Sequence, residues 1–299
     1  MNLWKGMICS RHAALRLIAA ATLLLTLLTA APAAARGGDS GYLALGDSVA
    51  FGYNPLVDPH NAANFIGYPS TVATALDLHL TNAACPGETS AGFISLTGSD
   101  NSCRPYRAVF PLHTAYTTAQ LDFAVAFLRD HPHTDLVSIN IGANDLFVLQ
   151  KGCTAAHPGD AAAIQQCITA GLPAVLNTLA ADLATIYGHI RTQGHYQGEL
   201  VALTYYVTNY SDPAAVATIS AANQVIARVT RQYDGVVADG FDAFRRVALH
   251  SGGDSCAAGL LIRLSSSTCD IHPSPRGRRL LAGAILRALG RDDAGEHDE

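Results

Sequence analysis

Residues 42–48 read Tyr-Leu-Ala-Leu-Gly-Asp-Ser, an apolar run that a glycine closes before two polar residues follow. A short apolar run without polar alternation is typical of a strand that is buried on both faces. Similar runs occur at residues 78–84, 136–141, 200–207 and 235–238. Segments of helical length and apolar spacing lie between and after these runs, at residues 69–77, 118–130, 161–191, 213–233 and 275–289. This alternation predicts an α/β fold with helices on both faces of a parallel sheet of about five strands.

The composition is that of a globular protein. Of the 299 residues, 49% are hydrophobic and only 14% are charged, which argues against disorder. The net charge of -5 provides no basic surface, so nucleic acid is not an expected partner. No internal repeat divides the chain, and we expect one domain over residues 36–290.

The N-terminus has the pattern of an export signal. Three basic residues precede an apolar segment at 17–31, and the small residues Ala33, Ala34 and Ala35 follow. We expect a signal peptide over residues 1–35 and a secreted mature protein. The alternative is a membrane anchor, but the apolar segment is shorter than the roughly 20 residues that span a bilayer. The polar tail at 291–299 is expected to be mobile.

Six cysteines follow the expected signal, and an even number in an exported chain indicates disulfides. Six cysteines allow 15 pairings. These six fall into three local pairs, which favours Cys85 with Cys103, Cys153 with Cys167, and Cys256 with Cys269. A zinc site is the alternative, although the chain has no C-x-x-C pair to support it.

The tripeptide Gly-Asp-Ser occurs three times, ending at Ser40, Ser48 and Ser255. Only Ser48 directly follows a predicted strand and precedes a segment that can begin a helix. A serine at this position gains backbone N–H groups that point toward a developing oxyanion, as acyl transfer requires. The alternative is a serine that only caps the helix. Ser40 and Ser255 have the surroundings of turn residues.

Three further candidates also follow predicted strands or precede the last helix. Gly87 has an unhindered N–H that can donate to an oxyanion, although most such glycines only form turns. Asn144, in Gly-Ala-Asn-Asp, offers an amide donor or is a simple turn former. His272 can act as a base because imidazole titrates near neutrality, although most of the twelve histidines are expected on the surface.

In this order, the four sites resemble the sequence blocks of the SGNH hydrolases, also called GDSL esterases and lipases. The resemblance spans residues 41–289 and implies a flavodoxin-like three-layer α/β/α sandwich without a metal or organic cofactor. It implies that Ser48 is the nucleophile and His272 its base. The oxyanion donors would be the backbone N–H groups of Ser48 and Gly87 and the side-chain amide of Asn144.

One residue departs from the family pattern. The family commonly has its acid three residues before the histidine, where this chain has Cys269, and the aspartate is Asp270. Either Asp270 or a backbone carbonyl would then orient the imidazole. The D-x-x-H sequence from Asp130 to His133 precedes the Gly-Ala-Asn-Asp block and is therefore out of order.

These features predict a secreted, monomeric serine hydrolase that cleaves small-molecule or lipid esters. A carbohydrate deacetylase or a phospholipase on the same scaffold is the alternative among enzymes. Aromatic residues after the strands favour an apolar acyl chain or an aryl ester, at Phe51, Phe147, Tyr205, Tyr206 and Tyr210. A noncatalytic binding module is the alternative from another class. A nucleotide-type cofactor is not expected, because the loop after residue 46 lacks the G-x-G-x-x-G pattern and Asp47 would repel phosphate.

Overall fold

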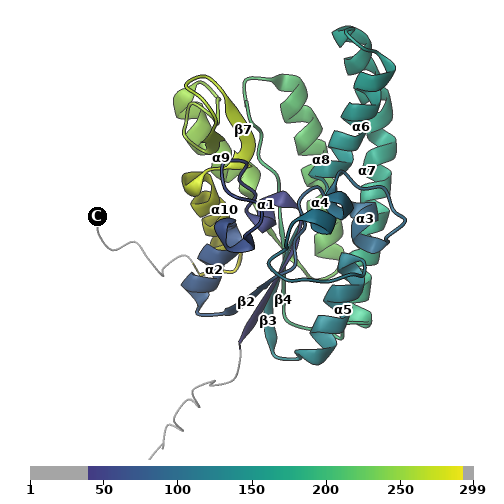
Figure 1. Cartoon of the computed structure of the whole chain (residues 1–299), viewed down its shortest axis with the longest axis vertical. Coiled ribbons are helices and arrows are strands. Elements are labelled where there is room, and N and C mark those ends of the chain that lie inside the picture. The colour runs from purple at the N-terminus through teal and green to yellow at the C-terminus, as the bar shows by residue number, and fades with distance from the viewer. Residues whose placement is uncertain (1–39, 292–299) are drawn as a thin grey trace, which may run out of the picture. The chain divides into compact units, whose positions relative to one another are not determined.

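The computed structural model of the chain describes residues 40–291 (Figure 1). The expected signal at 1–35 lies outside the described residues, as does the tail from residue 292 onward. The central sheet has five parallel strands in the order β2-β1-β3-β4-β5. The strands are β1 Gly41–Gly46, β2 His79–Asn82, β3 Thr134–Asn140, β4 Glu199–Leu203 and β5 Val236–Ala238. This strand order is the flavodoxin-like one, so the predicted fold class is confirmed.

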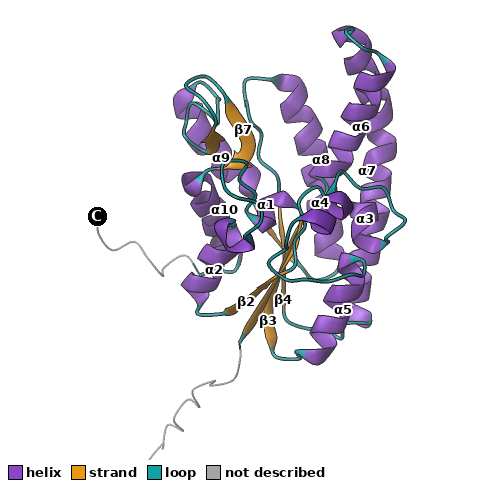
Figure 2. Ribbon diagram, in the orientation of Figure 1, coloured by secondary structure: helices purple, strands orange, loops and turns teal. Residues whose placement is uncertain are grey.

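Helices cover both faces of the sheet (Figure 2). The α-helices are α1 Ser48–Phe51, α2 Tyr68–Leu76, α3 Ser90–Ile94, α4 Cys103–Val109, α5 Gln120–Asp130, α6 Ala143–Ala156, α7 Ala161–Thr192, α8 Pro213–Gln232, α9 Gly240–Ala248 and α10 Pro275–Ala288. Short 3₁₀ helices occur at Ala62–Asn64 and Leu249–Ser251. On one face α10 packs against α2 and α9, and on the other α7 packs between α5 and α8.

Local sequence signals explain where the main elements begin. Four consecutive residues of β1, from Tyr42 to Leu45, are fully buried, as an apolar strand between two helical layers requires. The helices α8 and α10 each begin with a side-chain cap and a proline at the first position, where its missing N–H has no partner to lose. The caps are Asp212 and Ser274.

Several elements were not predicted. Helix α6 begins inside the Gly-Ala-Asn-Asp motif, for which the sequence predicts an amide donor or a turn former at Asn144 but no helix. Helices α3, α4 and α9 are short, and the antiparallel hairpin of β6 Leu261–Arg263 and β7 Cys269–Pro273 has strands too short to show a period. Strand β2 is also shorter than expected, because the chain leaves the sheet at Asn82. The missed elements are those in which tertiary contacts outweigh local pattern.

The structure contains the three disulfides that the local pairs favoured. Cys85–Cys103 joins the segment after β2 to the start of α4, and Cys153–Cys167 joins α6 to α7. Cys256–Cys269 anchors the start of β7. Two of the disulfides therefore tie down segments outside the central sheet, and the third joins two helices.

Helix α7 is unusually long, with 32 residues. By length and composition alone it is apolar enough to cross a membrane. In this fold its C-terminal half is part of the core, where Leu179, Leu183, Ile186 and Ile190 are fully buried. The other end of the helix extends with α6 past the neighbouring elements in Figure 1. Helix α7 thus packs against both α6 and α8.

Candidate active site

The segment that carries Ser48 makes an abrupt turn at the end of β1. Gly46 has a φ of +127°, and a Cβ at this position would lie 2.1 Å from the carbonyl oxygen of Asn140 on β3. Only glycine fits there without displacing the neighbouring strand. Asp47 then caps α1 by accepting the N–H of Val49 at 2.9 Å. Ser48 is therefore the first residue of a helix that begins directly at the sheet edge.

His272 lies beside Ser48 although the two residues are 224 positions apart. Nε2 of His272 is 2.8 Å from Oγ of Ser48. On the other side of the ring, Nδ1 forms a hydrogen bond with Oδ1 of Asp270. Two consecutive hydrogen bonds thus connect a hydroxyl, an imidazole and a carboxylate. The sequence analysis had left Asp270 and a backbone carbonyl as alternative partners of the ring, and Asp270 is the partner here.

The shifted position of the acid has a geometric reason. His272 and Asp270 belong to β7, and side chains two positions apart lie on the same face of a strand. The position three before His272 is Cys269, which is bonded to Cys256. Burial raises the pKa of Asp270, but the hydrogen bonds and charge of His272 outweigh it, so the pKa is lowered from the usual value. Asp270 is therefore suited to remain an ionised acceptor.

Two aromatic side chains support His272: Tyr53, which was not predicted as a site residue, and Tyr206, which was predicted only as an aromatic residue beside the substrate. The ring of Tyr53 packs against the imidazole, with 4.9 Å between the ring centroids. The hydroxyl of Tyr206 donates to the carbonyl of Ile271 at 2.7 Å, which holds β7 against the loop after β4. These contacts fix both the ring and the strand that carries it.

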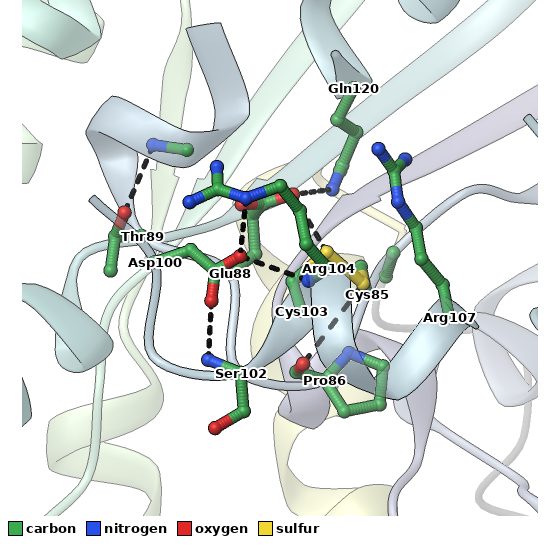
Figure 3. Close-up of a disulfide and its surroundings, with 12 residues drawn as sticks. Cys85, Pro86, Glu88, Thr89, Asp100, Ser102, Cys103, Arg104, Arg107 and Gln120 are labelled. Atoms are coloured by element: carbon green, nitrogen blue, oxygen red, sulfur yellow. Dashed lines mark hydrogen bonds and ion pairs between the residues drawn. A yellow bond between two sulfur atoms is a disulfide. The ribbon is translucent and has the colours of Figure 1, made fainter. Parts of the chain in front are cut away.

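Gly87 lies in the segment between β2 and α3. Its φ is +84°, and a Cβ there would lie 2.5 Å from the carbonyl oxygen of Asn101. A hydrogen bond of 2.9 Å from the N–H of Asn101 to the carbonyl of Gly87 joins the two segments. Gly87 and Asn101 both lie within the loop that the Cys85–Cys103 disulfide closes, and Figure 3 shows this disulfide. Glycine is therefore required at position 87 by both its backbone angle and its close neighbour.

Asn144 is the second residue of α6 and is almost fully buried. Its side-chain Nδ2 is 3.4 Å from Oδ2 of Asp47, and its Oδ1 accepts from Nδ2 of Asn101 at 2.8 Å. Asn144 therefore contacts the residue before Ser48 on one side and, on the other, Asn101, whose backbone N–H donates to the carbonyl of Gly87. Sequence reasoning did not find Asn101, because a polar residue in a loop carries no distinguishing signal.

Asp47 is a second residue whose contacts the sequence did not reveal. Its carboxylate is buried and accepts the hydroxyl of Tyr205 at 2.5 Å and the N–H of Val49. Burial raises the pKa of Asp47 to about 6, although both hydrogen bonds lower it. The aspartate of Gly-Asp-Ser thus links the turn at Ser48 to β4 and α6.

A cavity of about 470 Å³ opens beside Ser48. Ser48, Asn144 and His272 are among its lining residues, whereas Gly87 is not. Helices α6, α7 and α8 supply most of its walls. The larger aliphatic residues and the phenylalanine in its lining are Val49, Leu146, Phe147, Leu149, Ile168, Val207, Ile219 and Ile271. Of the aromatic candidates, Phe147, Tyr205 and Tyr206 line the cavity, whereas Phe51 is a core residue and Tyr210 is absent from its lining.

Other candidates from the sequence lie elsewhere. Ser40 precedes β1, and Ser255 is fully buried with its hydroxyl donating to the carbonyl of Val207 at 2.7 Å. Asp130 and His133 are exposed. Among residues 40–291, the one group of potential metal ligands that converge is Cys85, Glu88 and Cys103. Because its two sulfurs are bonded to each other, this group offers only a single carboxylate.

A hydroxyl, an imidazole and a carboxylate that are hydrogen-bonded in sequence at the edge of a parallel α/β sheet form an arrangement that hydrolases of several kinds use. The chain belongs to the GDSL-like Lipase/Acylhydrolase family, whose model matches residues 44–280. A search of the curated proteins found no match.

Solved structures of esterases and lipases share the fold. The extracellular lipase from Streptomyces rimosus is 19% identical, with a TM-score of 0.55 over 83% of this chain and 99% of its own. Phospholipase A1 from Streptomyces albidoflavus is 17% identical, with a TM-score of 0.53 over 85% of this chain and 100% of its own. An acetylxylan esterase from Geobacillus stearothermophilus is 18% identical, with a TM-score of 0.53 over 85% of this chain and 95% of its own. At these identities the likeness establishes the fold alone.

Proposed function

We propose that the chain is a secreted serine esterase or lipase that hydrolyses carboxylic esters through an acyl-Ser48 intermediate. The 2.8 Å contact between Ser48 Oγ and His272 Nε2 carries the proposal. A serine hydroxyl is a weak nucleophile, and an adjacent imidazole within hydrogen-bonding distance activates it. The carboxylate of Asp270 at Nδ1 favours the tautomer whose Nε2 is free to accept a proton.

In the proposed reaction Ser48 Oγ attacks the ester carbonyl while its proton moves to Nε2 of His272. The carbonyl electron pair moves to oxygen and creates a tetrahedral oxyanion. When this collapses, the bond to the alcohol breaks and His272 returns the proton to the leaving oxygen. A water molecule then repeats the sequence on acyl-Ser48, releasing the acid and restoring the serine hydroxyl.

The oxyanion requires donors that are in place before the reaction begins. We assign this role to the backbone N–H groups of Ser48 and Gly87 and to Nδ2 of Asn144. Ser48 is the first residue of α1, and the N–H groups of a helix's first turn have no partner within the helix and favour a negative charge. Asn144 lines the same cavity as Ser48. Gly87 is joined to Asn144 through Asn101, which supports its place in the set although it does not line the cavity.

The cavity favours an ester with an apolar acyl chain. Its walls above Ser48 are mostly apolar, with Leu146, Leu149, Ile168 and Ile219 on three different helices. Burying a methylene group stabilises a bound chain by about 0.8 kcal/mol. Acetylated glycans and phospholipids remain the alternatives, and the acyl-length profile distinguishes them from simple fatty esters.

Export to an oxidising compartment is part of the proposal. Three disulfides in the described residues favour such a compartment, because cytosolic proteins rarely keep them. The N-terminal signal pattern over residues 1–35 supports the same conclusion.

The decisive experiment is hydrolysis of p-nitrophenyl esters from acetate to palmitate by the mature protein and by Ser48→Ala. A serine-reactive phosphonate followed by mass spectrometry identifies the labelled residue. Activity that is lost in Ser48→Ala, together with a label on Ser48, supports the proposal. A folded protein with neither turnover nor label contradicts it and favours a noncatalytic binding role.

A further inference from the structure

Asn101 lies in the loop between α3 and α4, and it contacts two of the three assigned oxyanion donors. Its backbone N–H donates to the carbonyl of Gly87 at 2.9 Å. Its side-chain Nδ2 donates to Oδ1 of Asn144 at 2.8 Å. On the far side, its Oδ1 accepts from Nζ of Lys151 on α6 at 2.6 Å. A chain of hydrogen bonds therefore runs from Lys151 through Asn101 to Asn144.

We propose that Asn101 is a positioning residue for ester hydrolysis, which, together with Lys151, fixes the direction in which the amide of Asn144 points. The inference rests on the proposed function, since it assigns a role only if Asn144 Nδ2 stabilises an oxyanion. Asn101 itself does not line the cavity. It acts through Asn144 and does not touch the ester.

The direction follows from the donor and acceptor inventory of the four groups. A lysine ammonium can only donate, so it faces the oxygen end of the Asn101 amide. The nitrogen end of that amide then faces Asn144, whose oxygen must accept. The Asn144 nitrogen is consequently turned the other way, toward Oδ2 of Asp47, which also accepts the hydroxyl of Tyr205. The chain thus begins at a cation, ends at a carboxylate and excludes a flipped Asn144.

This arrangement supplies what an oxyanion donor needs. Electrostatic stabilisation of a transition state is effective when the donors need no reorientation during the reaction. A side-chain amide is otherwise free to rotate, and a flipped Asn144 would present an oxygen to the developing negative charge. The hydrogen bond from Asn101 removes that orientation, because it would place two amide NH₂ groups face to face.

The effect of the Asn101 side chain can be tested separately from the position of its loop. In the sequence, Gly87 and Asn101 both lie between the two bonded residues Cys85 and Cys103. The hydrogen bond from Asn101 to Gly87 uses backbone atoms only. Substitutions of the Asn101 side chain therefore leave the disulfide and this backbone contact in place and test the amide chain alone.

The test is a set of double-mutant cycles on p-nitrophenyl butyrate hydrolysis. Removing one oxyanion donor costs roughly a hundred- to a thousandfold in kcat, and we expect this for Asn144→Ala. Asn101→Ala is expected to lower kcat about tenfold or more, with KM changed little, because the interaction acts on the transition state. In the Asn144→Ala background the same change should have almost no effect, since coupled residues are not additive.

Asn101→Asp and Lys151→Met complete the cycle. The aspartate keeps the shape of the side chain but presents an oxygen to Oδ1 of Asn144, so its loss in kcat should exceed that of Asn101→Ala. Lys151 is exposed, so Lys151→Met is expected to fold and to lower kcat only severalfold, and not at all in the Asn101→Ala background. Asn64→Ala is the control, since it removes a similar surface hydrogen bond, to the carbonyl of Asp58 at 3.0 Å.

The outcomes separate the two proposals. An active wild type in which Asn101→Ala keeps full kcat, or loses as much with Asn144 absent as with it present, overturns the role of Asn101 alone. A wild type without esterase activity and without a label on Ser48 overturns the proposed function and this inference with it. Melting temperatures of the variants show whether any loss reflects unfolding.

Discussion

One oxygen of Asp270 contacts His272 twice, since Oδ1 accepts the backbone N–H at 2.9 Å and also bonds the ring at Nδ1. The two residues are only two positions apart on β7. The chain repeats this pairing at Asp58 and His60, where Oδ1 lies 3.0 Å from the backbone nitrogen and 2.9 Å from Nδ1. That second pair is exposed. The protein therefore contains its own matched control for a short aspartate–histidine pair.

We expect Asp270→Asn to lower kcat by about a thousand- to ten-thousandfold. An amide in place of the carboxylate favours the imidazole tautomer whose Nε2 already carries a proton and cannot accept the one from Ser48. Steady-state kinetics on p-nitrophenyl butyrate measure the loss. Asp58→Asn should leave kcat unchanged. If Asp270→Asn retains turnover within a few fold, another group orients the ring.

Filling the cavity should lower kcat/KM for long-chain esters more than for the acetate ester. Ile219→Trp places a large ring in the wall formed by α8, where a long acyl chain would lie. The ratio of kcat/KM for the octanoate ester to that for the acetate ester is expected to fall at least about tenfold, since a methylene in a pocket is worth roughly 1–3 kcal/mol. Leu249→Trp, at an exposed leucine outside the lining, is the control. An unchanged ratio would place the acyl chain elsewhere.

Glu88 predicts a pH dependence of stability. Burial raises its pKa to about 8; Asp100 raises it too, whereas Arg107, Arg104 and a hydrogen bond from Gln120 lower it (Figure 3). Between the ordinary glutamate range and pH 8, the folded state keeps a proton that the unfolded chain has lost, so this term makes the protein less stable as pH rises.

Glu88→Gln removes this term without changing the shape of the side chain. Its melting temperature relative to wild type should therefore rise between pH 5 and pH 8. Thermal unfolding followed by circular dichroism provides the measurement. Glu199→Gln, at the exposed start of β4, should follow the wild type at both pH values. A Glu88→Gln variant that also follows it would show that Glu88 is ionised in the folded state.

Two disulfides of similar loop length should have different effects on activity. Cys256–Cys269 and Cys153–Cys167 close sequence separations of 13 and 14 residues. Replacing either pair by serine should cost roughly 2–5 kcal/mol of stability. Only the first pair adjoins Asp270, so only its loss should lower kcat at a temperature where both variants are folded. Equal losses of kcat would mean that the hairpin of β6 and β7 is positioned by other contacts.

The sequence predicted those parts of the molecule that depend on local pattern. The apolar run at 42–45 identifies a strand buried on both faces, and the cysteine spacing indicates the three disulfides. Ser48, Asn144 and His272 were predicted as site residues, and the structure brings all three to one cavity. The sequence left the orienting role of Asp270 open. Residues two positions apart lie on the same face of a strand, but β7 itself was not predicted.

The remaining features depend on contacts between distant segments. Asn101 is one polar loop residue among many, and only the approach of α6 gives it Asn144 and Lys151 as partners. The buried environments of Asp47 and Glu88 arise from packing around loops whose sequences are ordinary. The cavity walls come from α6, α7 and α8, of which α6 was itself missed because it begins inside a turn-like motif.

The separation of Ser48 and His272 by 224 positions has a consequence for biosynthesis. Ser48 follows the first strand of the sheet, whereas His272 belongs to the hairpin of β6 and β7, which comes after all five strands of that sheet. A nascent chain that is still emerging from the ribosome, or still being threaded through a translocation channel, holds the first residue without the second. The hydroxyl and the imidazole can therefore meet only after all five strands of the sheet and the hairpin that follows them have been released.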